Sequence, residues 1–287
     1  MRLDDDGDRS NVEDRRGSGL GAALGGSGVK LGLGGTILLL ALSAYFRQDL
    51  FAVIGASPAV GGAAGPVAGA PDERRSAAET PLEKVAVASF NDSQRVWKGA
   101  LGERYRPARL VLFWDQTRSG CGAAGAEMGP FYCPADEKVY IDLGFYRELA
   151  SRFGAPGAFA QSYVIAHEVG HHLQSVLGIE PQVREAQRRH PEKRNALSVR
   201  LELQADCFAG VWGRSTEQRH LLDPGDLEAG LGAAAAVGDD RIQKSATGRV
   251  SPESFTHGSA AQRTQWFRRG FDSGRIEACD TFAASAL

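Results

Sequence analysis

The stretch HEVGH, residues 167–171, lies inside a largely apolar run, residues 158–177, which predicts one helix. Residues four apart on an α-helix are rotated by only about 40° from each other, so His167 and His171 project from one face with Cβ atoms roughly 5–6 Å apart. Two imidazoles in this arrangement can bind one Zn²⁺, which takes three protein ligands in a catalytic site. Glu168 is then placed to act as a general base on water. The motif therefore predicts zinc-dependent hydrolysis.

A site with two histidines needs a third ligand, and a later segment offers one. The metzincin pattern H-E-x-x-H-x-x-G-x-x-H is absent, because no further histidine follows the motif at that spacing. Residues 195–206 predict a helix that carries Glu202, which we expect to be the third ligand. Asp206 lies on the same helix face and can accept a hydrogen bond from the second ring nitrogen of a ligand histidine. Gly170 and Ala205 are small, so the two helices can approach closely.

The overall composition is that of a chain with a full-sized core and no strong charge bias. The chain has 287 residues, of which 43% are hydrophobic and 24% are charged, and its formal net charge is −2. This length and composition are sufficient for one well-buried domain. No basic stripe is visible, so we expect no nucleic-acid partner.

The amino-terminal part of the chain divides into a polar and an apolar segment. Residues 1–28 are polar, and we expect them to be disordered. Residues 31–46 carry no charge and would extend about 24 Å as a helix, compared with a hydrocarbon core of about 30 Å. Flanking apolar residues lengthen this stretch, and Lys30 and Arg47 can reach the interfaces. Residues 29–54 therefore predict a transmembrane anchor.

A cleavable signal peptide is the alternative to an anchor. The long acidic leader and the lack of a small-x-small cleavage site favour an uncleaved, single-pass anchor. Arg15, Arg16 and Lys30 precede the span, which predicts that the amino terminus is inside and the main domain is periplasmic or extracellular. Residues 55–79 are rich in Gly, Ala and Pro and predict a flexible linker. Residues 80–287 form the expected catalytic domain.

Four cysteines permit three complete disulfide pairings. If the domain is exported, these cysteines are expected to form disulfides in the oxidising environment outside the cytoplasm. We favour the pairing in which Cys121 and Cys133 close a local loop, while Cys207 and Cys279 clip the tail of the chain onto the ligand-bearing helix.

The remaining segments predict a small sheet followed mainly by helices, which is an α+β arrangement. The expected elements are a helix over 81–101, a buried strand over 109–114, a hairpin of 131–133 and 138–143, and helices over 145–153, 226–237 and 259–272. The strand over 138–143 is the expected edge of the sheet, where an extended peptide could pair by strand addition.

The expected reaction is hydrolysis of peptide bonds by a water that zinc binds and Glu168 activates. His257 is the expected donor to the developing oxyanion, and Tyr163 and Arg263 are the alternatives. A non-catalytic reading is that the chain is an envelope protein with a structural zinc, acting as a binding or chaperone module. Glu168 argues against this non-catalytic alternative, because a structural zinc site has no use for a general base beside its ligands.

The chain resembles the neutral zinc metallopeptidase family of bacteria in five stretches: AHEVGHHLQ (166–174), PFYCPAD (130–136), ELQADC (202–207), THGS (256–259) with Gln262 and Arg263, and NVEDRRG (11–17). The resemblance covers nearly the whole chain apart from the linker. It implies a membrane-anchored protein with a zincin-type domain that binds Zn²⁺ and acts on peptides or proteins. More distantly, residues 202–206 are similar to the E-x-x-A-D element of CAAX-prenyl-protease-type gluzincins, which implies that Glu202 is the third zinc ligand.

Overall fold

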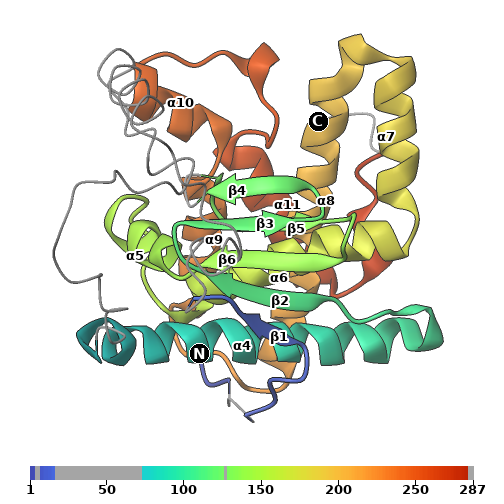
Figure 1. Ribbon diagram of the computed structural model, residues 1–287. Helices are drawn as coiled ribbons and strands as arrows, with labels where there is room; N and C mark the ends of the chain where they lie inside the picture. Colours follow the sequence, from blue (N-terminus) through green and yellow to red (C-terminus); the bar gives the residue numbers. More distant parts are fainter. Residues whose placement is uncertain (4–6, 17–72, 126–127, 284–287) are drawn as a thin grey trace, which may run out of the picture. The chain divides into compact units, whose positions relative to one another are not determined.

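Two sheets and a larger set of helices make up the described part of the chain (Figure 1). The computed structural model describes residues 1–3, 7–16, 73–125 and 128–283. The longer helices are α4 (Glu73–Leu101), α5 (Gly144–Ser151), α6 (Ala158–Val176), α7 (Ile179–Arg189), α8 (Arg194–Gln218), α9 (Asp226–Ala236), α10 (Asp239–Thr247) and α11 (Ala260–Ser273). The predicted α+β class, with a small sheet and a mainly helical remainder, is confirmed.

The main sheet has four strands in the order β1-β2-β6-β5. β2 (Arg109–Phe113) and β6 (Lys138–Asp142) are parallel neighbours at its centre. β1 (Val12–Asp14) runs parallel to β2, and β5 (Phe131–Cys133) runs antiparallel to β6. The predicted strand over 109–114 and the predicted hairpin are therefore present.

A separate hairpin of β3 (Gln116–Ser119) and β4 (Gly122–Gly125) was not predicted. Neither strand shows a clear alternation of apolar and polar residues, and β4 consists only of glycine and alanine. Without side chains of high strand propensity, the pairing leaves little trace in the sequence.

The prediction that residues 138–143 form the edge of the sheet is wrong. β6 lies between β2 and β5, and four of its five residues are buried. A strand that is covered on both faces belongs at the centre of a sheet, and the three consecutive apolar residues 139–141 were the signal for this. The edge next to the site is β5.

The amino-terminal residues differ from the expected disordered segment. Val12–Asp14 form β1, and the Asn11 carbonyl accepts a hydrogen bond of 2.8 Å from the Leu110 amide in β2. Residues Met1–Asp14 belong to the same compact unit as Ala78–Leu287. The polar composition hid this strand, because its partner lies about a hundred residues away and contributes the apolar surface.

The predicted anchor, residues 29–54, lies outside the described residues. Among the residues that are described, no helix combines the length and the apolar character needed to cross a membrane. The predicted linker, residues 55–79, is also mostly outside the described part. Its end is helical, because α4 begins at Glu73 and continues through Pro81.

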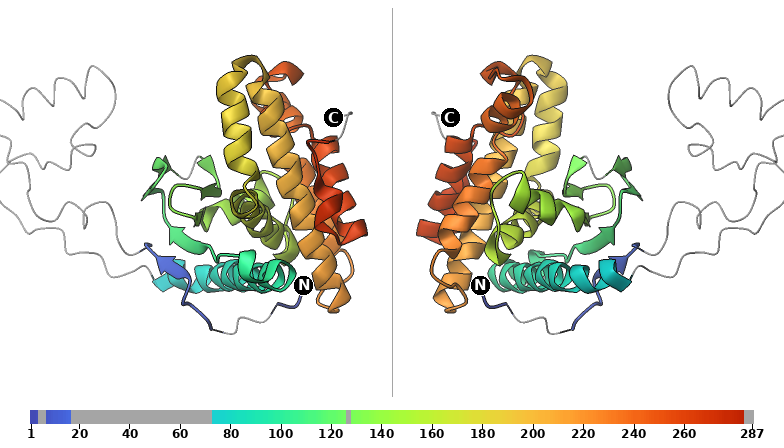
Figure 2. Two further views of the ribbon diagram at one scale, coloured as in Figure 1. Left: turned by 90° about the vertical axis from the view of Figure 1, so that its right-hand side faces the viewer. Right: turned by 90° about the vertical axis from the view of Figure 1, so that its left-hand side faces the viewer.

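The helix with the HEVGH motif occupies the middle of the domain. Figure 2 shows the strands on one side of α6, and α8 and α11 on the other. α6 packs against α8 and α9, and α8 packs along α11. The main core fills the space between these layers, and its largest buried side chains are Trp97, Trp212, Tyr146, Tyr163, Phe90, Phe159, Phe208 and Phe267.

Two glycines allow α8 and α11 to cross in close contact. A Cβ on Gly210 would lie closer than 3.0 Å to backbone atoms of Phe267 and Phe271, and a Cβ on Gly270 would overlap the Cys207 carbonyl. Only glycine fits at such a backbone contact. This crossing fixes the position of α8, which carries Glu202.

Two disulfides join Cys121 to Cys133 and Cys207 to Cys279, as predicted. The first connects the end of the β3–β4 hairpin to β5. The second fastens the short 3-10 helix η5 (Ile276–Cys279) to the middle of α8.

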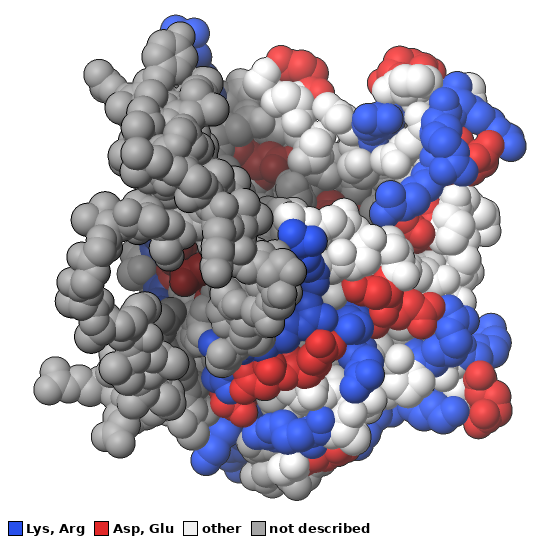
Figure 3. Space-filling view, viewed as in Figure 1, with Lys and Arg blue, Asp and Glu red and all other residues white. Residues whose placement is uncertain are grey.

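Charged side chains of both signs are mixed on the face shown in Figure 3, over the region of α4 and the neighbouring strands. Several form local pairs, such as Arg106 with Glu137 and Lys138 with Glu13, each at 2.8 Å. Neighbouring opposite charges cancel at a distance, so this part of the surface has no extended field of one sign.

Candidate metal centre and active site

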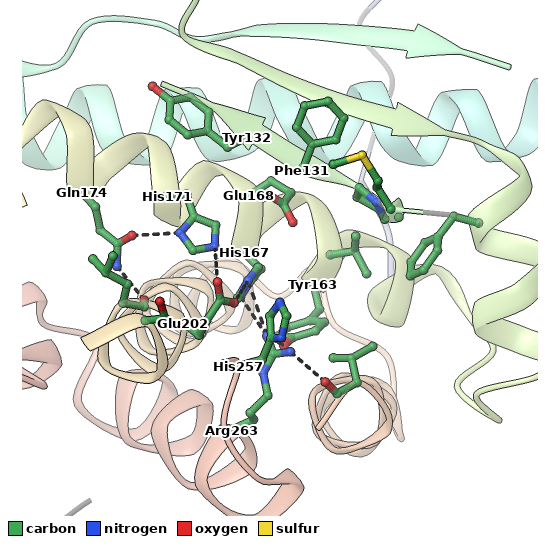
Figure 4. A pocket seen from close by; sticks show the side chains of 18 of the residues that line it. Phe131, Tyr132, Tyr163, His167, Glu168, His171, Gln174, Glu202, His257 and Arg263 are labelled. Carbon is green, nitrogen blue, oxygen red and sulfur yellow. Dashed lines mark hydrogen bonds and ion pairs between the residues drawn. The ribbon is translucent and has the colours of Figure 1, made fainter. Parts of the chain in front are cut away.

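Three predicted ligands converge where α6 faces α8. His167 Nε2 lies 3.2 Å from Glu202 Oε2, and His171 Nε2 lies 3.5 Å from Glu202 Oε1. One donor atom from each of the three side chains lies within 4.8 Å of the other two. Figure 4 shows both rings turned towards the carboxylate. The structure thus brings together the two histidines of the motif and the glutamate chosen from the later helix.

The close approach of the two helices depends on Gly170. A Cβ at this position would lie 2.9 Å from the Ala205 carbonyl oxygen and 3.0 Å from Ala205 Cα. Gly170 directly precedes His171, and Ala205 directly precedes Asp206. The predicted role of these two small residues is therefore confirmed by the backbone contact between them.

Asp206 contacts the Nδ1 side of the His167 ring, whereas Nε2 faces Glu202. Its Oδ1 lies 2.9 Å from His167 Nδ1 and 2.5 Å from the Tyr163 hydroxyl, and its Oδ2 accepts a 2.7 Å bond from Arg263 Nε. The carboxylate is fully buried. Burial raises the pKa of Asp206, but Arg263 and His167 outweigh this effect and hold the pKa below its ordinary value. Asp206 therefore stays ionised, which fixes a proton on His167 Nδ1 and leaves Nε2 for a metal.

The second histidine has a neutral partner that sequence reasoning missed. His171 Nδ1 lies 2.9 Å from Gln174 Oε1, and Gln174 is fully buried. The two residues are three apart on α6, which is the spacing of neighbours on one helix face. That spacing was the available signal for this contact.

The charges of the protein groups at this site favour a cation. Burial lowers the pKa of His167, but Asp206 and Glu202 outweigh it and raise the pKa to about 10. Burial also raises the pKa of Glu202, but the two imidazoles hold it well below its ordinary value. A site that stabilises positive charge this strongly and offers two nitrogens and one carboxylate matches the ligand preferences of Zn²⁺.

The three donors open onto a cavity of about 900 Å³, which Glu168 also lines. Figure 4 shows the Glu168 carboxylate directed into this space. Among the described residues, no side chain or backbone group forms a hydrogen bond with it. This cavity is large enough for several residues of a peptide. The Glu168 carboxylate thus lies beside the predicted ligands, without a hydrogen-bond partner among the described residues.

One wall of the cavity is apolar and belongs to the sheet side. β5 contributes Phe131 and Tyr132, and Met128, Phe145 and Phe153 line the same cavity. The Met128 side chain is 58% exposed, which is unusual for a large apolar residue in the described part of the chain. Exposed apolar groups that border a site commonly receive an apolar group of a ligand.

His257 lies at the rim of the same cavity, on the loop before α11. Its Nδ1 lies 3.2 Å from Asp239 Oδ1 and 3.0 Å from Thr256 Oγ1. Asp239 also accepts hydrogen bonds from the backbone amides of residues 256, 257 and 258. The hydrogen bond to Asp239 raises the pKa of His257. Sequence reasoning missed Asp239, because it lies eighteen residues earlier in a helix that was not predicted.

The three predicted oxyanion donors are placed differently. Tyr163 and Arg263 are buried and bonded to Asp206, so they stand behind His167. His257 is half exposed to the cavity, and its Nε2 has no hydrogen bond within the described ranges. His257 is therefore the best placed of the three to meet a substrate.

His172, the residue after the motif, is not part of the group of possible metal ligands. Its Nε2 lies 2.6 Å from the Arg106 carbonyl, and its Nδ1 lies 3.1 Å from the Tyr132 hydroxyl. Burial lowers the pKa of His172. This neutral histidine connects α6 to β5 and to the segment that precedes β2.

Comparison with known proteins gives a family but no solved homologue. A family model described as "Putative neutral zinc metallopeptidase" matches residues 1–282. The chain is 48% identical to "Uncharacterized protein YpfJ" of Escherichia coli (strain K12), over 99% of this chain and 100% of that protein. It is 45% identical to "Uncharacterized protein Mb2605" of Mycobacterium bovis, over 70% of this chain and 71% of that protein. No solved structure matches.

Proposed function

The chain belongs to the neutral zinc metallopeptidase family, whose metal is Zn²⁺, and from this premise we propose that it is a peptidase that hydrolyses peptide bonds. The observation that carries the proposal is the convergence of His167, His171 and Glu202 beside the free carboxylate of Glu168, in a cavity large enough for a peptide. These three residues would hold the metal.

The protein groups around the metal have separate roles in the proposed reaction. Zn²⁺ supplies, when bound, a Lewis acid that polarises the scissile carbonyl and makes water more acidic. Glu168 accepts the proton of the attacking water and returns it to the leaving amine. His257, held by Asp239, donates a hydrogen bond to the oxygen on which negative charge develops. Asp206 and Gln174 keep the two ligand histidines in the metal-binding tautomer.

The peptide binds along β5, the edge strand of the sheet. β5 lines the cavity and ends the order of described strands, so its outward backbone groups can pair with an extended chain. Phe145 and Phe153, whose ring centroids lie 6.3 Å apart, line the same cavity as Met128 and offer apolar surface to a ligand. We expect a large apolar residue next to the scissile bond.

The decisive test is to replace Glu168 and measure zinc and hydrolysis separately. The Glu168→Gln variant of the full chain should bind as much zinc as the parent and lose hydrolysis of a peptide library by at least about 10³-fold. Glu180→Gln is the matched control, because Glu180 lines the same cavity but lies on α7 and pairs with Arg184. It should hydrolyse peptides like the parent. Equal hydrolysis by parent and Glu168→Gln would reject the proposal.

The alternative, a non-catalytic envelope protein with a structural zinc, is disfavoured by the openness of the site. Structural zinc sites are closed by four protein ligands, whereas the donor group found among the described residues has three and faces a cavity. A parent protein that binds zinc but cleaves no member of the library would favour the alternative.

We also propose that the domain works outside the cytoplasm and is attached to a membrane. Two disulfides between all four cysteines support an oxidising compartment. The apolar stretch of residues 29–54 supports the attachment. Fractionation of cells that produce the full chain tests both points.

A further inference from the structure

A pair of buried glutamines connects the second ligand histidine to a disulfide. Gln174 Nε2 donates to the Leu201 carbonyl at 2.7 Å and lies 3.2 Å from Gln204 Oε1. Gln204 Nε2 donates in turn to the Cys279 carbonyl at 2.9 Å. Both side chains are almost completely buried, so these contacts are not shared with bulk water.

The two backbone carbonyls determine which way each amide points. A carbonyl oxygen only accepts hydrogen bonds, so the NH₂ end of Gln174 must face Leu201, and the NH₂ end of Gln204 must face Cys279. The Oε1 atom of Gln174 is therefore turned towards His171, where it accepts a hydrogen bond from Nδ1–H. The remaining ring nitrogen, Nε2, then carries the lone pair and faces Glu202.

The chain of contacts ends at a covalent link. Cys279 is bonded to Cys207, which lies on α8 three residues after Gln204. Two further bonds hold the segment after the cysteine, because Thr281 Oγ1 donates to the Arg200 carbonyl and Arg200 donates to the Thr281 carbonyl. The disulfide thus keeps an acceptor in front of Gln204.

We propose that Gln174 and Gln204 are positioning residues that set the tautomer of His171, and that the Cys207–Cys279 disulfide supports zinc binding through them. The inference rests on the metal site of the proposed function and not on its catalytic step. Groups that orient a metal-ligating histidine typically contribute a factor of 10–100 to metal affinity. Reduction of this disulfide would therefore weaken the metal site of the enzyme.

Zinc affinity of the full chain, measured by competition with a chromophoric chelator, tests the role of the glutamines. Gln204 has no hydrogen bond to His171, but its replacement in Gln204→Leu should still lower zinc affinity about tenfold, because it removes the partner of Gln174. Gln187→Leu is the matched control, because Gln187 also joins two helices through its amide but has no path to His171. In ¹⁵N NMR spectra of the zinc-loaded protein, the Nδ1–H of His171 should exchange faster in Gln204→Leu than in the control. Equal affinity in Gln204→Leu and Gln187→Leu would overturn the proposal.

The two disulfides provide a second matched pair. Replacing Cys207 and Cys279 by serine should lower zinc affinity about tenfold, whereas replacing Cys121 and Cys133 should leave it unchanged. Thermal unfolding of each metal-free variant shows whether it is folded at the assay temperature. If the first double variant is folded and binds zinc like the parent, the link to the disulfide is refuted. Because metal binding is measured directly, a parent that binds zinc without cleaving peptides would reject the proposed function and leave this inference standing.

The amino-terminal strand carries a second, independent inference. β1 pairs with β2, and Glu13 Oε2 lies 2.8 Å from Lys138 Nζ in β6. Further upstream, the Asp8 carbonyl accepts a hydrogen bond of 2.9 Å from Asn91 Nδ2 in α4. These contacts join a segment that precedes residues 29–54 to the domain that follows them.

We infer that β1 and the domain of residues 78–287 lie on the same side of the membrane. A single crossing by residues 29–54 would place β1 and β2 in different compartments, where they could not pair. Since the disulfides indicate an oxidising compartment, both lie outside the cytoplasm. This arrangement is incompatible with the expectation that residues 29–54 cross the membrane once with the amino terminus inside, and it requires that their attachment to the membrane begins and ends on one side.

Labelling of single cysteines in intact cells tests this arrangement. Ser10 and Ser151 are exposed, one before residues 29–54 and one after them. Ser10→Cys and Ser151→Cys, each in the full chain, should both react with a membrane-impermeant maleimide before lysis. Labelling of one site and protection of the other until lysis would overturn the inference. Protection of both sites would overturn their placement outside the cytoplasm.

Discussion

Replacing Gly170 by alanine perturbs the contact that holds the metal site together. The added Cβ would lie 2.9 Å from the Ala205 carbonyl oxygen, whereas ordinary contacts begin at 3.4 Å. Relief of this contact requires α6 and α8 to separate by about half an ångström. The separation falls beside His171 and Glu202, one on each helix, so it enlarges the gap that a metal must bridge.

The size of the effect follows from two opposing contributions. Overpacking of this kind costs about 1–3 kcal/mol, while alanine in place of glycine gains about 1 kcal/mol of helix propensity. Gly232→Ala is the matched control, because Gly232 lies within α9 with open space around its missing Cβ. The propensity gain is common to both variants, so the difference between them measures the overpacking. We expect Gly170→Ala to be about 1–3 kcal/mol less stable than Gly232→Ala.

The assay combines thermal unfolding with zinc competition. For a domain of this size, a difference of 1 kcal/mol corresponds to about 2–4 °C in Tm. We also expect zinc affinity to fall about tenfold in Gly170→Ala and to stay unchanged in Gly232→Ala. If both variants are equally stable and bind zinc equally well, the close contact between α6 and α8 does not shape the site, and the reasoning is refuted.

Three further outcomes test the groups around the site. Asp206→Asn should lower the free energy of unfolding by about 3–5 kcal/mol in urea titrations, because it leaves the Arg263 guanidinium buried without its carboxylate; a loss below 1 kcal/mol would contradict the buried pair. Asp239→Asn should shift the alkaline limb of the kcat/KM profile to lower pH, since Asp239 raises the pKa of His257 and the protonated donor is lost as pH rises through that pKa; an unshifted limb would separate His257 from catalysis. Removal of zinc by a chelator should lower Tm, because ligand at 100 times its Kd stabilises the folded state by about 2.7 kcal/mol; an unchanged Tm would contradict a bound metal.

Local spacing in the sequence predicted much of the site. The pair His167 and His171, and the pair Glu202 and Asp206, each lie four apart on a helix, so their faces follow from helix geometry alone. The end of α6 was also predictable from local sequence, because its apolar run stops before Gly178, which adopts a left-handed conformation. Such features need only information carried by neighbouring residues.

Features that depend on distant partners were not visible in the sequence. β1 is polar and becomes a strand only by pairing with β2. Asp239 contacts His257 because the intervening loop brings the two residues together. The amide of Gln204 is oriented by its hydrogen bond to the carbonyl of Cys279. In each case the partner is far away along the chain and leaves no local periodicity.

The central claim is that one metal ion is held jointly by α6 and α8, and zinc content tests it most directly. The parent, purified as the full chain, should contain about one zinc per molecule by elemental analysis. Glu202→Gln keeps the size of the side chain but removes the charged oxygen that faces both imidazoles. We expect it to lose the metal at zinc concentrations that saturate the parent. Equal zinc content in parent and Glu202→Gln would contradict the account.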